Sequence, residues 1–137
     1  MMTVPESGEA IAKKRILLVD DDEGFREATA AMLRSAGYEV RTAPDFRLAL
    51  EILESSEAID LFVLDIVMPD RVNGLALARM ARLRRPTIKI VYVSGYDLVG
   101  IEAEALGPII RKPLDEDAFL AQIATVLASC PGIGPRR

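Results

Sequence analysis

Four short apolar runs in this chain each lead to a residue that can carry chemistry. The runs are Ile16–Val19, Leu61–Leu64, Ile90–Val93 and Ile109–Ile110. The residues that follow them are Asp20–Asp22, Asp65, Ser94 and, after one arginine, Lys112. Continuous apolar runs of this length are typical of parallel strands that helices cover on both faces. Because ligands bind outside the carboxyl ends of such strands, the pattern predicts one site that gathers acids, a hydroxyl and an amine.

Segments with helical spacing alternate with the strands. Strands are predicted at residues 15–20, 39–43, 60–64, 89–94 and 109–111. Helices are predicted at residues 25–36, 45–53, 74–83 and 115–127, with a short one within 96–106. Asp45 and Asp115 are suited to cap two of these helices, and Gly37 to end the first. We therefore expect an α/β fold with a parallel five-stranded sheet.

Length and composition indicate one soluble domain. The 137 residues suffice for one core, and the sequence has no apolar stretch near the 20 residues of a membrane span. Residues 1–14 are expected to form a flexible lead-in without a signal peptide, 15–128 the domain, and 129–137 a tail. The single cysteine, Cys130, fits a reducing compartment, so we expect a cytoplasmic protein without a membrane anchor.

Charge gives a weaker indication. The net charge of −4, from 17 basic and 21 acidic residues, argues against direct nucleic-acid binding. A basic cluster lies near the end of one predicted helix, at Arg79, Arg82, Arg84 and Arg85. Such a cluster is more often a solvated helix end than a contact patch, since cations there also favour the helix dipole.

The absence of histidine narrows the chemistry further. The sequence contains no histidine, which excludes a histidine general base, a Ser-His-Asp triad and a histidine metal ligand. The candidate site must therefore work with carboxylate, hydroxyl, amine and backbone groups.

Three carboxylates beside one amine are typical of a divalent-cation site. Asp20, Asp21 and Asp65 would resist joint ionisation without a cation, and oxygen ligands favour Mg²⁺ over zinc. A carboxylate can also act as a nucleophile and hold an acyl phosphate. Phosphoryl transfer needs in-line positioning and charge neutralisation, which Mg²⁺ and Lys112 would supply, with hydrogen bonds from Ser94.

An ordered set of motifs resembles the response regulator receiver domain of two-component signalling. The motifs are Ile16–Asp21, Leu64–Pro69 with Asn73-Gly74, Val93–Gly95 and Lys112-Pro113. The resemblance covers about residues 15–128 and implies a flavodoxin-like three-layer (βα)5 sandwich with strand order 2-1-3-4-5. It also implies a partner histidine kinase or histidine phosphotransfer protein. A receiver domain catalyses only its own phosphorylation and dephosphorylation, so no independent enzyme activity is expected.

The resemblance also implies a role for each site residue. Asp65 is similar to the phosphoacceptor, Asp21 to the direct metal ligand, and Asp20 to the acid that acts on the metal through water. Val67 would offer its backbone carbonyl to the metal, while Ser94 and Lys112 would contact the phosphoryl group. The Lys112-Pro113 bond is expected to be cis.

The chain also departs from the family pattern near its last strand. Ile109 stands where many members have a tyrosine or phenylalanine, and only 17 residues separate Ser94 from Lys112. These differences predict that output runs through rearrangement of residues 95–108 and not through an aromatic switch.

Two other function classes remain open at this point. A haloacid-dehalogenase-like phosphatase would use Asp20, Asp22, Ser94 and Lys112, but it would leave Asp65 without a role. A binding module on the same fold that is not phosphorylated would leave the whole set of site residues unused.

Overall fold

The computed structural model describes residues 13–66, 74–95 and 105–129. Within them lies a five-stranded parallel sheet with the order β2-β1-β3-β4-β5. The strands are β1 (Arg15–Val19), β2 (Glu39–Ala43), β3 (Leu61–Asp65), β4 (Lys89–Ser94) and β5 (Ile109–Arg111). The predicted strand order and fold class are therefore confirmed. Every residue of β3 is buried, as expected for a central strand covered on both faces.

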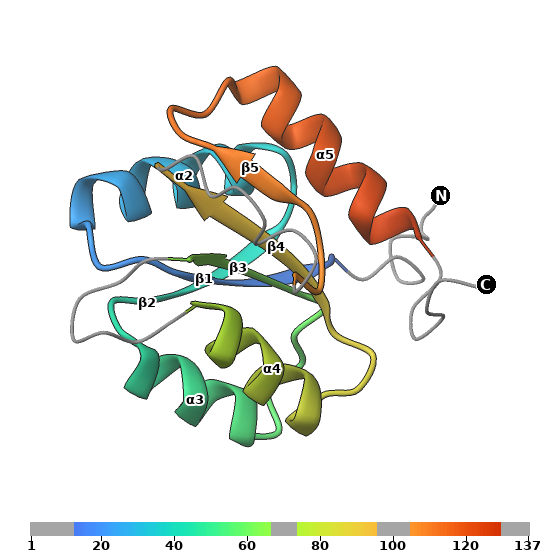
Figure 1. Ribbon diagram of the computed structural model, residues 1–137. Coiled ribbons are helices and arrows are strands. Elements are labelled where there is room, and N and C mark those ends of the chain that lie inside the picture. The colour runs from blue at the N-terminus through green and yellow to red at the C-terminus, as the bar shows by residue number, and fades with distance from the viewer. Residues whose placement is uncertain (1–12, 67–73, 96–104, 130–137) are drawn as a thin grey trace, which may run out of the picture.

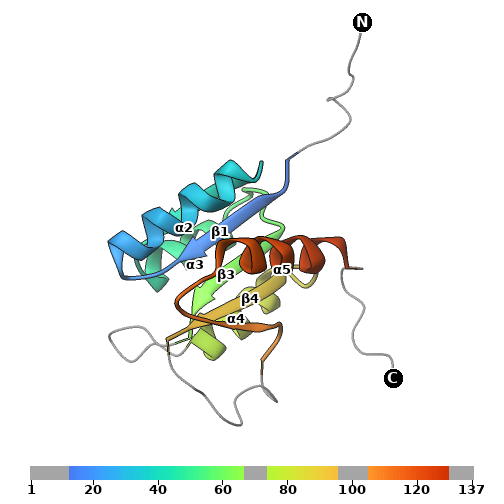
Figure 2. The same cartoon turned by 90° about the horizontal axis from the view of Figure 1, so that it is seen from above.

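Helices cover both faces of this sheet and make the molecule three layers thick (Figure 1). The described helices are α2 (Glu23–Ser35), α3 (Phe46–Glu54), α4 (Gly74–Arg84) and α5 (Glu116–Ala128). The apolar sides of α2 and α5 share one core cluster, and those of α3 and α4 share the other. Figure 2, seen from above, shows α2 and α5 on the same side of the sheet. Successive side chains along each strand point to opposite faces of the sheet, so the strands contribute to both core clusters.

Aspartates begin three of the described helices. Asp22, Asp45 and Asp115 each accept a hydrogen bond from the backbone N–H three residues on, in the usual N-cap geometry. The Asp45 and Asp115 caps confirm the prediction. Helix α2 begins two residues before the predicted start at Phe25, because Asp22 is its cap. The short helix predicted within 96–106 falls almost wholly outside the described residues.

Tyr92 joins β4 to the residues that lead into β5. Its ring is fully buried, and its hydroxyl accepts a hydrogen bond from the Leu106 N–H at 3.0 Å. The Tyr92 N–H donates to the Pro108 carbonyl at 2.9 Å. Burial raises the pKa of the Tyr92 hydroxyl, so the group stays neutral and retains its proton. An aromatic residue therefore fixes this segment from β4, although Ile109 on β5 is aliphatic.

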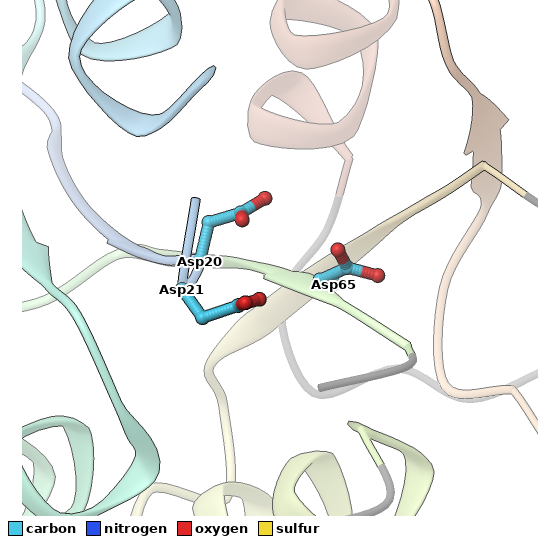
Figure 3. Close-up of side chains that lie close together, drawn as sticks. All are labelled: Asp20, Asp21 and Asp65. Atoms are coloured by element: carbon cyan, nitrogen blue, oxygen red, sulfur yellow. The ribbon is translucent and has the colours of Figure 1, made fainter. Parts of the chain in front are cut away.

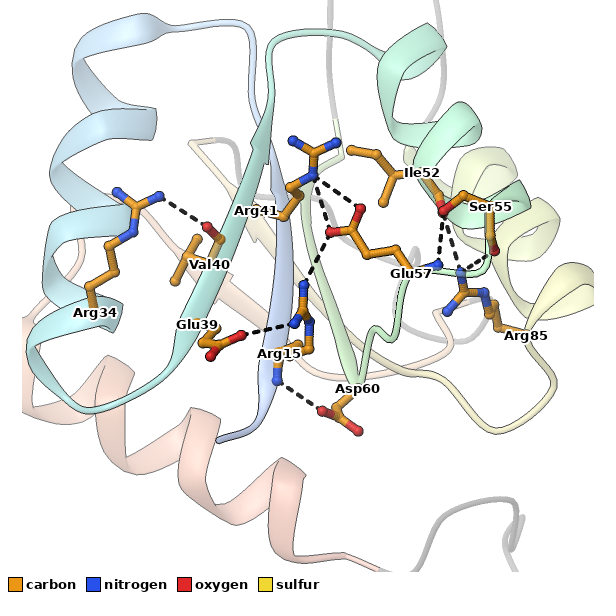
Figure 4. A network of polar contacts seen from close by, with 10 residues as sticks. All are labelled: Arg15, Arg34, Glu39, Val40, Arg41, Ile52, Ser55, Glu57, Asp60 and Arg85. Carbon is orange, nitrogen blue, oxygen red and sulfur yellow. Dashed lines mark hydrogen bonds and ion pairs between the residues drawn. The ribbon is translucent and has the colours of Figure 1, made fainter. Parts of the chain in front are cut away.

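The basic cluster is partly used within the fold. Arg84 pairs with Glu54 at 2.8 Å, and Arg85 donates to the carbonyls of Ile52, Leu53 and Ser55 at the end of α3. Figure 4 shows Arg85 against Ile52 and Ser55. These two cations satisfy carbonyls and a carboxylate near the end of a neighbouring helix, where positive charge is favoured. They therefore hold α3 and α4 together.

A second polar network lies at the start of β1, where the strands begin (Figure 4). Arg15 donates its backbone N–H to Asp60 at 2.8 Å, and its guanidinium pairs with Glu39 at 2.9 Å. Glu57 is shared between Arg15 and Arg41. Each charged group in this network has a partner of opposite charge or a hydrogen-bond donor, so the network stabilises the fold. The candidate site occupies the opposite, carboxyl edge of the same sheet.

No helix in the described parts of the chain is both long and apolar enough to cross a membrane.

Candidate functional site

The sequence-predicted acids meet at the carboxyl edge of the sheet (Figure 3). Asp20 follows β1 directly, Asp21 comes next, and Asp65 is the last residue of β3. One carboxylate oxygen of each lies within 4.8 Å of the others. β1 and β3 are adjacent parallel strands, with Val19 opposite Leu64, so their following residues are brought side by side. The sequence-based expectation that these three side chains gather at one edge is met.

Asp20 is held rigidly in this group. Only 1% of the residue is exposed, and its carboxylate accepts a hydrogen bond from the Asp22 N–H at 2.9 Å. The guanidinium of Arg26 donates to the Asp20 carbonyl at 2.8 Å. Burial raises the pKa of the Asp20 carboxyl and the charge of Asp65 adds to the rise, whereas the Asp22 N–H and Lys112 oppose it. Ionisation of the Asp20 carboxyl is therefore unfavourable unless additional positive charge binds nearby.

Lys112 places its positive charge beside Asp20 and Asp65. Its Nζ lies 3.0 Å from Asp65 Oδ2 and 3.4 Å from Asp20 Oδ2. Burial alone would lower the pKa of Lys112, but the hydrogen bond and charge of Asp65 and the charge of Asp20 outweigh it and raise that pKa. Lys112 is therefore a permanent cation at neutral pH. Its bond to Pro113 is cis, as expected.

Ser94 and Lys112 are tied together through the backbone. Ser94 is fully buried at the end of β4, one residue after Val93, which pairs with Asp65 of β3. The Ser94 carbonyl accepts a hydrogen bond from the Lys112 N–H at 2.8 Å. Lys112 directly follows β5, so three adjacent strands present the Asp65 carboxylate, the Ser94 hydroxyl and the Lys112 amine. Val67, the expected carbonyl ligand, lies outside the described residues.

Helix α4 packs directly behind the acid on β3. A Cβ on Gly74 would stand 2.5 Å from the Asp65 carbonyl oxygen and 2.6 Å from the Ile66 Cα, closer than any real Cβ contact. The Gly74 N–H donates to the Ile66 carbonyl at 2.7 Å. Only glycine allows this approach. The sequence motif contains this glycine but gives no sign of the close contact that requires it.

The side chains present fit a hard divalent cation. All three candidate ligands are carboxylates, with no thiolate or imidazole among them, and Mg²⁺ and Ca²⁺ prefer such oxygen donors. The desolvated Asp20 carboxyl adds to the case, because a bound cation would offset the cost of its charge. Asp21 is exposed and would be open to a hydrated ion.

Asp20→Asn is expected to stabilise the protein when divalent cations are removed with EDTA. The gain at pH 7 should be on the order of 1 kcal/mol of unfolding free energy, because the variant no longer buries a charged carboxylate. The folded state raises the pKa of Asp20 above 3.8, so this carboxyl favours folding at low pH, and that contribution is lost as pH rises through the folded pKa. The gain should therefore shrink toward pH 4.

Urea unfolding at a series of pH values would measure this effect. Asp21→Asn is the matched control, since its carboxylate belongs to the same cluster but is exposed. A loss of stability in Asp20→Asn at pH 7, equal in size at pH 4, would contradict the account of the buried charge.

Comparison with known proteins fits this geometry. The family model for the response regulator receiver domain matches residues 16–124. The receiver protein CpdR of Brucella abortus is 34% identical over 110 residues, which cover 80% of this chain and 90% of CpdR. The sensor kinase/phosphatase CqsS of Vibrio cholerae is 35% identical over 119 residues, which cover 82% of this chain but only 17% of CqsS. The chain thus matches nearly all of one relative and a small part of another.

A solved structure of similar fold comes from Thermotoga maritima. The response regulator TrrA, in complex with Mg²⁺-BeF, superposes with a TM-score of 0.72 at 30% identity and covers 82% of this chain and 98% of its own. The family match extends over most of the domain, which decides against the phosphatase alternative. By sequence and by topology, the chain belongs to the response regulator receiver domains of two-component systems.

Proposed function

We propose that this chain takes a phosphoryl group onto Asp65 from a phosphohistidine of a kinase or phosphotransfer protein, and that this changes a protein-binding surface. The observation that carries the proposal is the position of Asp65. The residue is buried at the carboxyl edge of the sheet, and its carboxylate lies 3.0 Å from the Lys112 ammonium, with Asp20 and Asp21 alongside. Relatives that include a sensor kinase support the choice of donor. Residues 15–128 form the functional domain, working in the cytoplasm without contacting nucleic acid.

The reaction is a transfer between two nucleophiles. A carboxylate oxygen of Asp65 forms a bond to phosphorus while the bond between phosphorus and the donor imidazole nitrogen breaks, and that nitrogen keeps the electron pair. Lys112 pairs with an oxygen of the arriving phosphoryl group, and the Ser94 hydroxyl donates a hydrogen bond to another. The preorganised charge and hydrogen bonds require no histidine in this chain.

The three carboxylates would also hold a magnesium ion. Asp21 would bind it directly, Asp20 through water, Asp65 through its carboxylate, and Val67 through its backbone carbonyl. A bound Mg²⁺ neutralises charge on the phosphoryl oxygens. TrrA, which is similar in fold, was solved with Mg²⁺ and a beryllofluoride group.

The added phosphoryl group would act as a switch. It adds a charge of about −2 to an edge that already holds three acids, so Lys112 and Ser94 would exchange their present partners for phosphoryl oxygens. A shift between two conformations would then alter binding to a downstream protein. The expectation that residues 95–108 carry this change stays a prediction, because 96–104 lie outside the described part of the chain.

Intact-protein mass spectrometry tests the proposal. Incubation with a small acyl phosphate and Mg²⁺ should add the mass of one phosphoryl group to the wild type, and EDTA should prevent the addition. Asp65→Asn should gain no mass. Incorporation that survives Asp65→Asn would exclude Asp65 as the acceptor. A wild type that gains no mass from either an acyl phosphate or a set of phosphorylated kinases would favour a module that only binds partners.

A further inference from the structure

An aromatic ring touches the amine of the candidate site. The Nζ of Lys112 lies 4.1 Å from the centroid of the Phe25 ring, within the range of a cation–π interaction. Phe25 is in the first turn of α2, and its backbone N–H donates to the Asp22 cap at 3.1 Å. The cap that begins the helix therefore also fixes the position of this ring. Its spacing in the sequence indicated only a core residue.

Among the residues that the structure describes, the ammonium of Lys112 has three close partners of two kinds. Two are carboxylates, Asp65 at 3.0 Å and Asp20 at 3.4 Å, and the third is the Phe25 ring. The carboxylates are the groups that a metal ion and a phosphoryl group would engage. The ring can neither bind a metal ion nor react with a phosphoryl group, so of these three partners it is the one whose contact need not change during the reaction.

The lysine side chain needs such a fixed partner. Its four-carbon stem has high rotamer freedom, and Gly95 next to Ser94 has no side chain to restrain it, although a Cβ there would touch the Lys112 Cδ at 3.9 Å. The Lys112 side chain remains 23% exposed, so water competes for its ammonium. A ring over the ammonium reduces both the freedom and the hydration.

We propose that Phe25 is a positioning residue for Lys112, holding the ammonium over the site while its anionic partners are exchanged. The role rests on the proposed function, because it matters only if Lys112 pairs with a phosphoryl group. Phe25 also packs on the core cluster that α2 and α5 share, so its contribution to the core has to be separated from its effect on Lys112.

Three variants separate these effects. Phe25→Leu keeps apolar bulk but removes the ring, and Phe25→Tyr keeps the ring. Tyr38→Leu is the matched control, because Tyr38 follows α2 and packs on the same core cluster. Thermal unfolding would establish that all three are folded before their rates are compared.

Two readouts are needed. The first is the proton NMR shift of the Lys112 ε-methylene in metal-free protein. A stacked ring should move it upfield in the wild type and in Phe25→Tyr, with the ordinary lysine value in Phe25→Leu. The second is the rate of phosphorylation by a small acyl phosphate at saturating Mg²⁺. Phe25→Leu should be about fivefold slower, while Phe25→Tyr and Tyr38→Leu should stay near the wild-type rate.

Any other result would contradict either the ring contact, the positioning role or the proposed function. An unshifted ε-methylene in the wild type would contradict the ring contact. If Phe25→Leu were phosphorylated at the wild-type rate, or if Phe25→Tyr and Tyr38→Leu were slowed as much as Phe25→Leu, the positioning role would be contradicted. The proposed function would remain intact. A wild type that is never phosphorylated would instead overturn the proposed function, and the role of Phe25 with it.

Discussion

Gly107→Ala is expected to cost about 3 kcal/mol or more of unfolding free energy. A Cβ at this position would stand 1.7 Å from the Ile90 carbonyl oxygen and 2.7 Å from its carbonyl carbon. Both are backbone atoms of β4, which is paired with β3 on one side and β5 on the other, so no side-chain movement can relieve the overlap. The segment before β5 would have to move away from the strand.

The cost should extend to the contacts beside Gly107. Moving this segment breaks the hydrogen bond from the Leu106 N–H to the buried Tyr92 hydroxyl and the one from the Tyr92 N–H to Pro108. A buried polar group left without a partner costs about 1–3 kcal/mol. Since β5 leads directly to Lys112, the site should lose its amine together with the stability.

Urea unfolding followed by circular dichroism would measure the loss. Gly24→Ala is the control, because Gly24 lies within helix α2 and a Cβ there would meet the Asp22 carboxylate at 3.5 Å, an ordinary contact. It should stabilise the protein by up to about 1 kcal/mol through helix propensity. Equal stability of Gly107→Ala and the wild type would show that the segment does not lie against Ile90.

Lys112→Met is expected to bind Mg²⁺ more tightly than the wild type and yet to be phosphorylated about 100-fold more slowly. The ammonium lies 3.0 Å from Asp65 and 3.4 Å from Asp20, so it competes with a metal ion for two of the three carboxylates. Removing it frees those oxygens for the ion. It also removes the charge that would pair with the phosphoryl oxygens, and the rate should fall.

Calorimetry suits the binding measurement, since the chain has no tryptophan whose fluorescence could report the metal. Lys89→Met is the matched control. It deletes the same charge at the first residue of β4, where Lys89 donates to the carbonyls of Leu127 and Ser129 far from the acids. Both Mg²⁺ affinity and rate should change little there. Weaker metal binding in Lys112→Met would contradict the idea that lysine and metal share the carboxylates.

Local patterns predicted much of the architecture. The boundaries of β2, β4 and β5 agree with those expected. In β4 and β5 an apolar run bounded by charged residues and turns leaves little choice of end points, whereas β2 alternates polar and apolar residues. Asp45 and Asp115 cap helices as expected, since a cap is a contact within four residues. The gathering of Asp20, Asp65 and Lys112 followed from parallel strands sharing one carboxyl edge.

Contacts between distant segments were not predictable in the same way. The crowding of Gly107 against Ile90 and the ring of Phe25 over Lys112 depend on how helices and loops settle on the sheet. A single sequence carries no periodic signal for such pairs, which lie 17 and 87 positions apart. The start of α2 was missed by two residues for a local reason, because any of the three consecutive acids could have served as the cap.

The central claim is that Asp65, and no other carboxylate of the cluster, receives the phosphoryl group. Borohydride reduces an acyl phosphate to an alcohol and so converts a phosphorylated aspartate into homoserine. Peptide mass spectrometry of protein treated with an acyl phosphate, Mg²⁺ and then borohydride should find homoserine at position 65 and aspartate at positions 20 and 21. Homoserine at position 20 or 21, with aspartate intact at 65, would contradict the account.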